Sequence, residues 1–315
     1  MAVSAAFRRM KERSDETLEY LRSRIRFDIG VQQKTKLKVL GDLADRTLLA
    51  NAIAEKHGER LAEQFKRRWG SFTKNEMKSR LRFITVLAEL VPLDLEITSR
   101  AMNQMFTRLD YVFKGVKGIE VIGAAEIEIV NIEKMKAMAS VADEARKLDV
   151  IVAMMPAEEK SLYKTGITSY ALVHFHGIVD LGSKGEENRQ SIEKSVKRYW
   201  NQNYALQIKN LYSTKAVKKN LEDIAAYLTK GGNENLIYKI GFGYDNAEKL
   251  ERQMLKAGKT AKQGDYAGIE NEMSLTITEI KFLGEAINQM MERTGSRNLR
   301  NGYLYKCGQP QHWVR

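Results

Sequence analysis

The chain has 315 residues, of which 43% are hydrophobic and 29% are charged, so wholesale disorder is excluded. Its 52 Lys and Arg outnumber its 40 Asp and Glu, and the resulting net charge of +12 favours a polyanionic partner such as nucleic acid. A solvated basic surface or an anionic membrane would account for the same charge. The single cysteine excludes an intramolecular disulfide framework and a cysteine zinc cluster.

Targeting and membrane signals are absent from the sequence pattern. Residues 1–20 carry charges where a secretory signal needs an apolar run, and no stretch has the uninterrupted apolar length of a membrane helix. We therefore expect a protein without a membrane partner, located in the reducing cytoplasm, where a lone cysteine is unremarkable.

The predicted secondary structure changes near residue 80, from helices to alternating strands and helices. Residues 1–80 place apolar side chains among dense charges and predict a helical N-terminal region. The apolar segment 82–90 predicts a strand that ends at Pro92, and 93–115 has the apolar spacing of a helix. The Ile- and Val-rich segment 118–130 predicts a second strand.

Strands and helices continue to alternate after this point. In order, the pattern predicts a helix at 133–148, an ambiguous segment at 149–155, the clearest strand of the chain at 169–182, a helix at 192–200, a strand at 204–212 and a helix at 215–230. This alternation predicts an α+β domain with a central antiparallel sheet flanked by helices. We divide the chain into a helical region at 1–80, this domain at 81–240 with an insertion at 131–168, and a basic, mixed but mostly helical region at 241–315 of unknown role.

A pair of histidines lies in the clearest predicted strand, in the order His174-Phe175-His176. Residues two apart in a strand point to the same face, so both imidazoles project together while Phe175 packs on the other side. Two adjacent imidazoles make a partial metal site, although satisfied core histidines would give the same pattern. A histidine-triad hydrolase would need a third histidine where Ile178 stands, and a cupin would need a nearly all-β chain.

The preceding predicted strand offers a third metal ligand. Glu126 and Glu128 are two apart and therefore share a face. A carboxylate on an otherwise apolar strand is costly unless it is exposed or bound to something. Ligation of a metal by one of the pair is favoured by the nearby histidines, and exposure on an open sheet face is the alternative.

The helix predicted at 215–230 carries Tyr227 at the border of its apolar stripe, with Lys230 three residues on and on the same side. Tyrosine can act as a nucleophile when its surroundings assist it, and a lysine can help to neutralise charge that develops on a phosphate. The spacing alone is common by chance, so its meaning depends on the order of the other motifs.

That order resembles the HUH endonuclease superfamily, and within it the rolling-circle replication initiators of plasmids and phages. The resemblance covers roughly residues 82–240 and rests on three motifs taken jointly: Phe83-Ile84-Thr85-Val86-Leu87, His174-Phe175-His176 and Tyr227-Leu228-Thr229-Lys230.

The resemblance implies a nuclease domain that nicks and rejoins single-stranded origin DNA. It implies that His174, His176 and an acidic residue hold Mg²⁺ or Mn²⁺. Glu128 is the preferred acid because Ile127-Glu128-Ile129 fits the family's pattern best, and Glu126 is the reserve. Adjacent double-stranded DNA and a host helicase and polymerase are the further partners it implies.

The resemblance also implies the chemistry of the tyrosine helix. Tyr227 would attack the DNA to give a 5′-phosphotyrosine link and a free 3′-OH, with Lys230 as helper at the phosphate. Some members carry a second tyrosine where Gly231 stands, so we expect single-tyrosine chemistry, with Tyr238 available for a later step. The long insertion at 131–168 is a second departure from the family, and neither terminal region has a match.

Two alternatives stay open. An HUH transposase or relaxase would use similar residues, although relaxases generally place the tyrosine upstream of the histidines. A non-catalytic, basic DNA-binding protein would use His174, His176 and Tyr227 only as structural residues.

Two further segments resemble known binding motifs. Gly258-Lys259-Thr260 resembles the end of a phosphate-binding loop, but Gln253 occupies the position of the required glycine, so we expect no fused NTPase. Lys197-Arg198-Tyr199-Trp200 sets aromatic beside basic residues and could stack bases, with a core tryptophan under a solvated basic face as the alternative.

Overall fold

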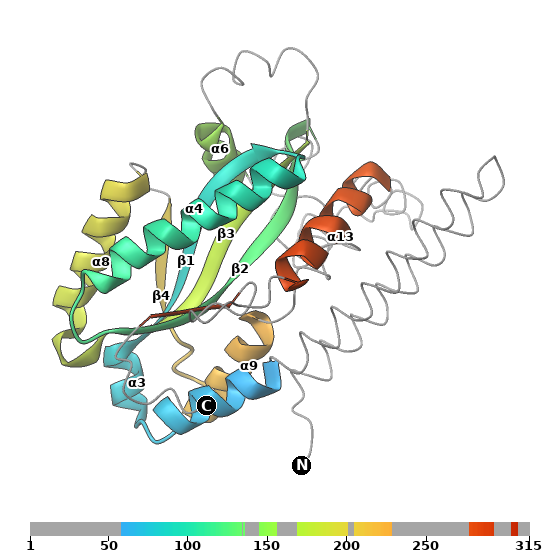
Figure 1. Cartoon of the computed structure of the whole chain (residues 1–315). Helices are drawn as coiled ribbons and strands as arrows, with labels where there is room; N and C mark the ends of the chain where they lie inside the picture. The colour runs from blue at the N-terminus through green and yellow to red at the C-terminus, as the bar shows by residue number, and fades with distance from the viewer. Residues whose placement is uncertain are drawn as a thin grey trace, which may run out of the picture.

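The structure is a computed structural model that describes residues 58–133, 135, 145–155, 169–200, 205–228, 277–292 and 304–307. In this part of the chain five strands form one antiparallel sheet in the order β4-β1-β3-β2-β5, flanked by helices (Figure 1). The α+β class with a central antiparallel sheet is therefore confirmed.

The elements follow the predicted order. The strands are β1 (Leu81–Pro92), β2 (Glu120–Asn131), β3 (Ser169–Asp180), β4 (Leu206–Asn210) and β5 (Leu304–Cys307). The helices are an unlabelled one at 58–69, α3 (Lys74–Arg80), α4 (Leu95–Lys114), α6 (Ala145–Met154), α8 (Gly185–Trp200), α9 (Val217–Leu228) and α13 (Ile277–Glu292), with a 3₁₀ turn η1 (Gly182–Lys184). None of the described helices is long and apolar enough to cross a membrane.

Strand β3 is the centre of the sheet. It pairs with β1 on one side and β2 on the other along its whole length, and all its residues after Ser169 are buried. A strand covered on both faces by other elements gives such a continuous buried run, in place of the alternation of a half-exposed strand. Helix α4 links β1 to β2 and crosses one face of the sheet, with α8 beside it (Figure 1).

Phe175 marks the face that α4 covers. Its ring packs edge-on against Tyr305 at 5.7 Å, and the Tyr305 ring in turn stacks on Phe106 of α4 at 6.0 Å. Gly123 and Gly177 are directly paired beside Phe175, and a Cβ on Gly123 would collide with the Phe175 ring and the His176 carbonyl. The two glycines therefore leave the space that the Phe175 ring fills.

The opposite face of the sheet is covered less completely. Along β1, Ile84 and Val86 on the α4 side are fully buried, whereas Phe83 and Thr85 on the other side are only partly buried. Helix α9 contacts β3 on this second face. The histidines of β3 point to this side because they alternate with Phe175.

One helix begins earlier than the sequence pattern predicted. The sequence pattern predicts this helix only from residue 192, but α8 starts at Gly185. Glu186 and Glu187 fill its first turn, where carboxylates interact favourably with the helix dipole. Arg189 adds ion pairs to Glu186 and Glu193, so the exposed polar turns are stabilised by charge spacing that an apolar-periodicity argument overlooks.

The other differences concern helix α6 and the two edge strands. The ambiguous segment at 149–155 belongs to a helix, α6, and β4 is shorter than the strand predicted at 204–212. Residues 304–307, in the C-terminal region to which no strand was assigned, form β5 and pair with β2. A strand of four residues is too short to show a period of two, so only its pairing partner reveals it.

Candidate metal centre

The register between β2 and β3 brings three potential metal ligands to one face. Glu126 lies directly opposite His174, and Ala124 lies opposite His176. Directly paired residues in an antiparallel sheet point to the same side. The two imidazoles and the Glu126 carboxylate therefore share the face that α9 contacts.

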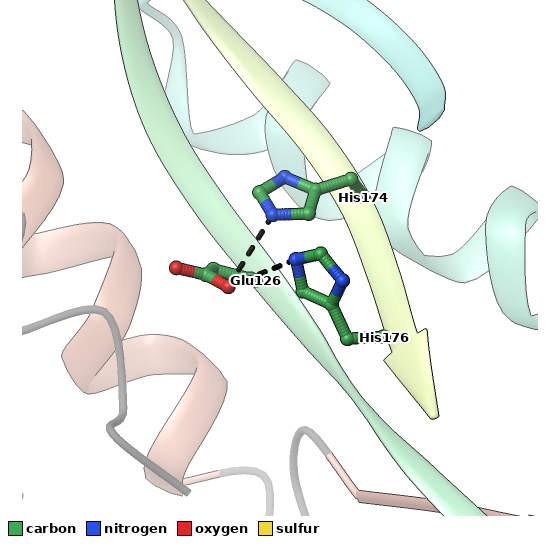
Figure 2. Close-up of side chains that lie close together, drawn as sticks. All are labelled: Glu126, His174 and His176. Carbon is green, nitrogen blue, oxygen red and sulfur yellow. Dashed lines mark ion pairs between the residues drawn. The ribbon is translucent and has the colours of Figure 1, made fainter. Parts of the chain in front are cut away.

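The three side chains converge on a single point. The Glu126 Oε2 atom lies 3.3 Å from Nε2 of His174 and 3.4 Å from Nε2 of His176, as the dashed lines of Figure 2 mark. All three ligand atoms lie within 4.8 Å of one another. With metal–ligand bonds of about 2.0–2.2 Å, donors that subtend tetrahedral or octahedral angles are roughly 3.0–3.5 Å apart, so the two separations from Glu126 fit donors to one shared divalent cation.

Burial strengthens the case for a cation. The exposed fraction is 2% for His174, 5% for Glu126 and 9% for His176. A carboxylate so deeply buried is costly unless its charge is compensated. A divalent cation would supply that compensation while leaving the imidazoles neutral, which is the form that binds metals. The two imidazole nitrogens suit borderline divalent ions, and the carboxylate oxygen also suits harder ones.

Thr85 on β1 orients one of the imidazoles. Its hydroxyl lies 2.8 Å from Nδ1 of His176, directly across the β1–β3 ladder. When the Nδ1–H group donates to this hydroxyl oxygen, the lone pair of Nε2 points at the common centre. Partners of this kind fix the tautomer and ring angle of a ligating histidine.

The structure selects Glu126 rather than Glu128 as the acidic member of the group. Glu128 is also buried, but it is paired with Leu172, which lies two residues before His174 on β3. Among the described residues, the group that could hold a metal consists of Glu126, His174 and His176. Both glutamates lie on the same face of the sheet as the histidines, so the spacing of two could not distinguish them. The long insertion before β3 also prevented the β2–β3 register from being inferred from sequence.

Tyr227 projects from α9 towards this centre. Its phenol oxygen is 3.4 Å from Nε2 of His176, and the two rings have centroids 5.2 Å apart. The side chain is 40% exposed, so a large substrate can reach it. Lys230 and Tyr238 lie outside the described residues, and their roles remain predictions.

Phe83 and Thr85, which the sequence analysis cited only as part of the first motif, contact the site residues. The Phe83 ring stacks on His176 at 5.7 Å and meets Tyr227 edge-on at 5.7 Å. Their spacing of two within a predicted strand was the available signal, since it places both on one face. Across the ladder, the exposed Lys209 pairs with Phe83, which adds a positive charge on the same face.

Ion pairs hold the helix that carries Tyr227. Lys66 of the helix at 58–69 bonds to Glu222 at 2.8 Å, while Asp223 contacts Lys215 at 2.8 Å and Lys219 at 2.9 Å. Burial acts to raise the pKa of Asp223, but the hydrogen bonds and charges of the two lysines outweigh it and hold that pKa below its usual value. The ionised carboxylate therefore stabilises the start of α9.

These features together define a buried two-histidine, one-carboxylate centre with an accessible tyrosine beside it. Comparison of the chain with protein-family models, curated proteins and solved structures gives no match.

Proposed function

We propose that the protein is a metal-dependent nickase of the HUH type that cleaves and rejoins single-stranded DNA through Tyr227, and that it acts as a rolling-circle replication initiator. The observation that carries the proposal is the position of the Tyr227 phenol oxygen, 3.4 Å from Nε2 of His176, beside a convergent Glu126–His174–His176 group. The net charge of +12 supports a nucleic-acid substrate.

Each residue has a distinct part in this proposal. His174, His176 and Glu126 hold a divalent cation, Mg²⁺ or Mn²⁺. When bound, this cation would polarise the scissile phosphate and offset charge that develops on its oxygens. Thr85 keeps the His176 ring aligned, Phe83 supports the rings of His176 and Tyr227, and Lys209 attracts the DNA backbone on the same face.

The proposed reaction is a transesterification. The Tyr227 oxygen loses its proton and forms a bond to phosphorus, while the bond from phosphorus to the 3′ oxygen breaks. The departing 3′ oxygen takes up a proton, and the 5′ end stays on the tyrosine as a phosphodiester. One phosphodiester replaces another, so attack by a 3′-OH reverses the step and rejoins a strand without an external energy source.

The test uses labelled single-stranded fragments that tile the parent replicon, incubated with the full chain and Mn²⁺. We expect one fragment to give a covalent protein–DNA adduct that survives denaturing electrophoresis. The adduct should disappear with a chelator and in His176→Ala. A chain that binds the fragments tightly but cleaves none of them would contradict the proposal and favour a non-catalytic DNA-binding protein.

A further inference from the structure

Two tyrosines form an exposed stack on the side of the sheet away from the metal centre. Tyr111 of α4 and Tyr199 of α8 have ring centroids 5.7 Å apart and an angle of 18° between their planes. Tyr111 is 61% exposed and Tyr199 is 36% exposed. The stack therefore presents aromatic surface to solvent and does not belong to the core.

Trp200, the next residue after Tyr199, is buried in the core instead of exposed to solvent. The guanidinium of Arg108 lies over its ring at 5.7 Å. The segment Lys197-Arg198-Tyr199-Trp200 thus combines a core anchor, Trp200, with an outward tyrosine. Trp200 fixes the end of α8 against α4, and this contact positions Tyr199 beside Tyr111.

The two helices that carry the stack also carry basic residues. Arg108 and Lys114 stand three residues before and after Tyr111 and so flank it along α4. Helix α8 carries Lys194, Lys197 and Arg198 in the two turns that end at Tyr199 and Trp200. Asp110 accepts a hydrogen bond from Tyr305 at 2.9 Å and pairs with Lys114 at 3.1 Å, so the charge of Lys114 is partly neutralised, and Glu193 is paired with Arg189 at 2.6 Å.

We propose that this aromatic–basic surface, defined by Tyr111, Tyr199 and the basic residues of α4 and α8, binds single-stranded nucleic acid. Unpaired bases stack on the tyrosine rings, and phosphates contact the lysines and arginines. Stacked aromatics within a basic field are the features that bind single strands with little sequence preference. In a duplex the base faces are occupied by their neighbours, so the tyrosines have less to contribute.

The surface is separate from the metal centre. The ring of Phe175, next to α4, and the imidazoles of His174 and His176 point to opposite faces of β3. Binding there needs no metal and no nucleophile. Binding of nucleic acid at this surface therefore does not depend on the proposed nicking activity, and it can be tested separately.

The experiment measures binding of a fluorescently labelled oligothymidine by anisotropy, with a chelator present and with Tyr227→Phe in every chain to prevent cleavage. We expect the pair Tyr111→Ala and Tyr199→Ala to weaken binding by about tenfold, as the loss of base–aromatic stacking does elsewhere. Tyr111→Phe with Tyr199→Phe keeps both rings and should retain the parent affinity. Ile97→Ala, which removes an exposed apolar side chain elsewhere on α4, is the matched control.

A duplex of the same length is measured in parallel. A smaller loss for the duplex than for the single strand supports base stacking. Unchanged binding in the alanine pair, or an equal loss for single strand and duplex, would overturn the proposal. A loss in the phenylalanine pair as large as in the alanine pair would overturn it too, because both rings are still present. The nicking proposal is tested by a different experiment, in which it fails if the unmodified chain gives no covalent adduct with DNA.

Discussion

At the scale of single residues, the two glutamates of β2 make a matched pair for testing the metal centre. They lie two residues apart on one strand and share a face. Only the Glu126 carboxylate is placed beside both imidazoles, with its Oε2 at 3.3 and 3.4 Å from their Nε2 atoms. The claim that a cation lies at this point can therefore be tested with two substitutions of the same chemistry.

We predict that Glu126→Gln weakens Mn²⁺ binding by about 100-fold or more, because loss of a direct ligand should cost at least as much as the upper end of what loss of an outer-shell partner costs. Glu128→Gln should leave the affinity within a few-fold of the parent, since its carboxylate is displaced from the centre. Calorimetric titration of the full chain with Mn²⁺ measures both. A larger loss in Glu128→Gln than in Glu126→Gln would reverse the assignment of the ligand.

Thr85 provides a second test at this scale. Thr85→Val keeps the shape of the side chain but removes the hydroxyl that lies 2.8 Å from Nδ1 of His176. We expect a loss of Mn²⁺ affinity of about 10- to 100-fold, because the ring loses the partner that sets its tautomer. Thr85→Ser should restore most of the affinity. Equal affinities in the valine and serine variants would show that the hydroxyl does not orient the ring.

At the scale of elements, α9 depends on charges near its start to carry Tyr227 to the sheet. Asp223→Asn removes the ionised partner of Lys215 and Lys219. Near neutral pH we expect a loss of about 0.5 kcal/mol in the free energy of unfolding, since partly exposed pairs are screened by solvent.

The pH dependence of that loss has a definite sign. The pKa of Asp223 is lowered in the folded state, so its ionised form contributes stability above the pKa of a free aspartate, and this contribution fades as the pH falls through the folded pKa. Urea unfolding of the parent and of Asp223→Asn should therefore differ near neutral pH, and the difference should shrink as the pH falls below the pKa of a free aspartate. A difference that grows on acidification would contradict the role given to the carboxylate.

Several elements could be predicted from sequence because their own periodicity specifies them. β3 is recognisable from its continuous apolar run, and its two histidines were correctly placed on one face by their spacing of two. Helix α4 likewise follows its apolar stripe. What the sequence could not supply was the register between strands, and this register decides which glutamate meets His174.

At the scale of the whole molecule, the central sheet separates two surfaces of different chemistry. One face holds the buried Glu126–His174–His176 group with the exposed Tyr227 beside it, and the other carries α4, α8 and the stacked tyrosines. Contacts such as β5 with β2 join segments distant in sequence, so no local pattern predicts them.

The most direct measurement asks which residue becomes linked to DNA. Adducts formed with Mn²⁺ and a cleavable single-stranded fragment are digested, and the peptide that retains a nucleotide is identified by mass spectrometry. Tyr212 is the matched control, because it is 70% exposed and lies shortly before α9 on the same stretch of chain. We predict the nucleotide on Tyr227, no adduct in Tyr227→Phe, unchanged Mn²⁺ affinity in that variant, and normal adduct in Tyr212→Phe. A nucleotide on another residue, or an adduct that persists in Tyr227→Phe, would contradict the assignment of Tyr227 as the nucleophile.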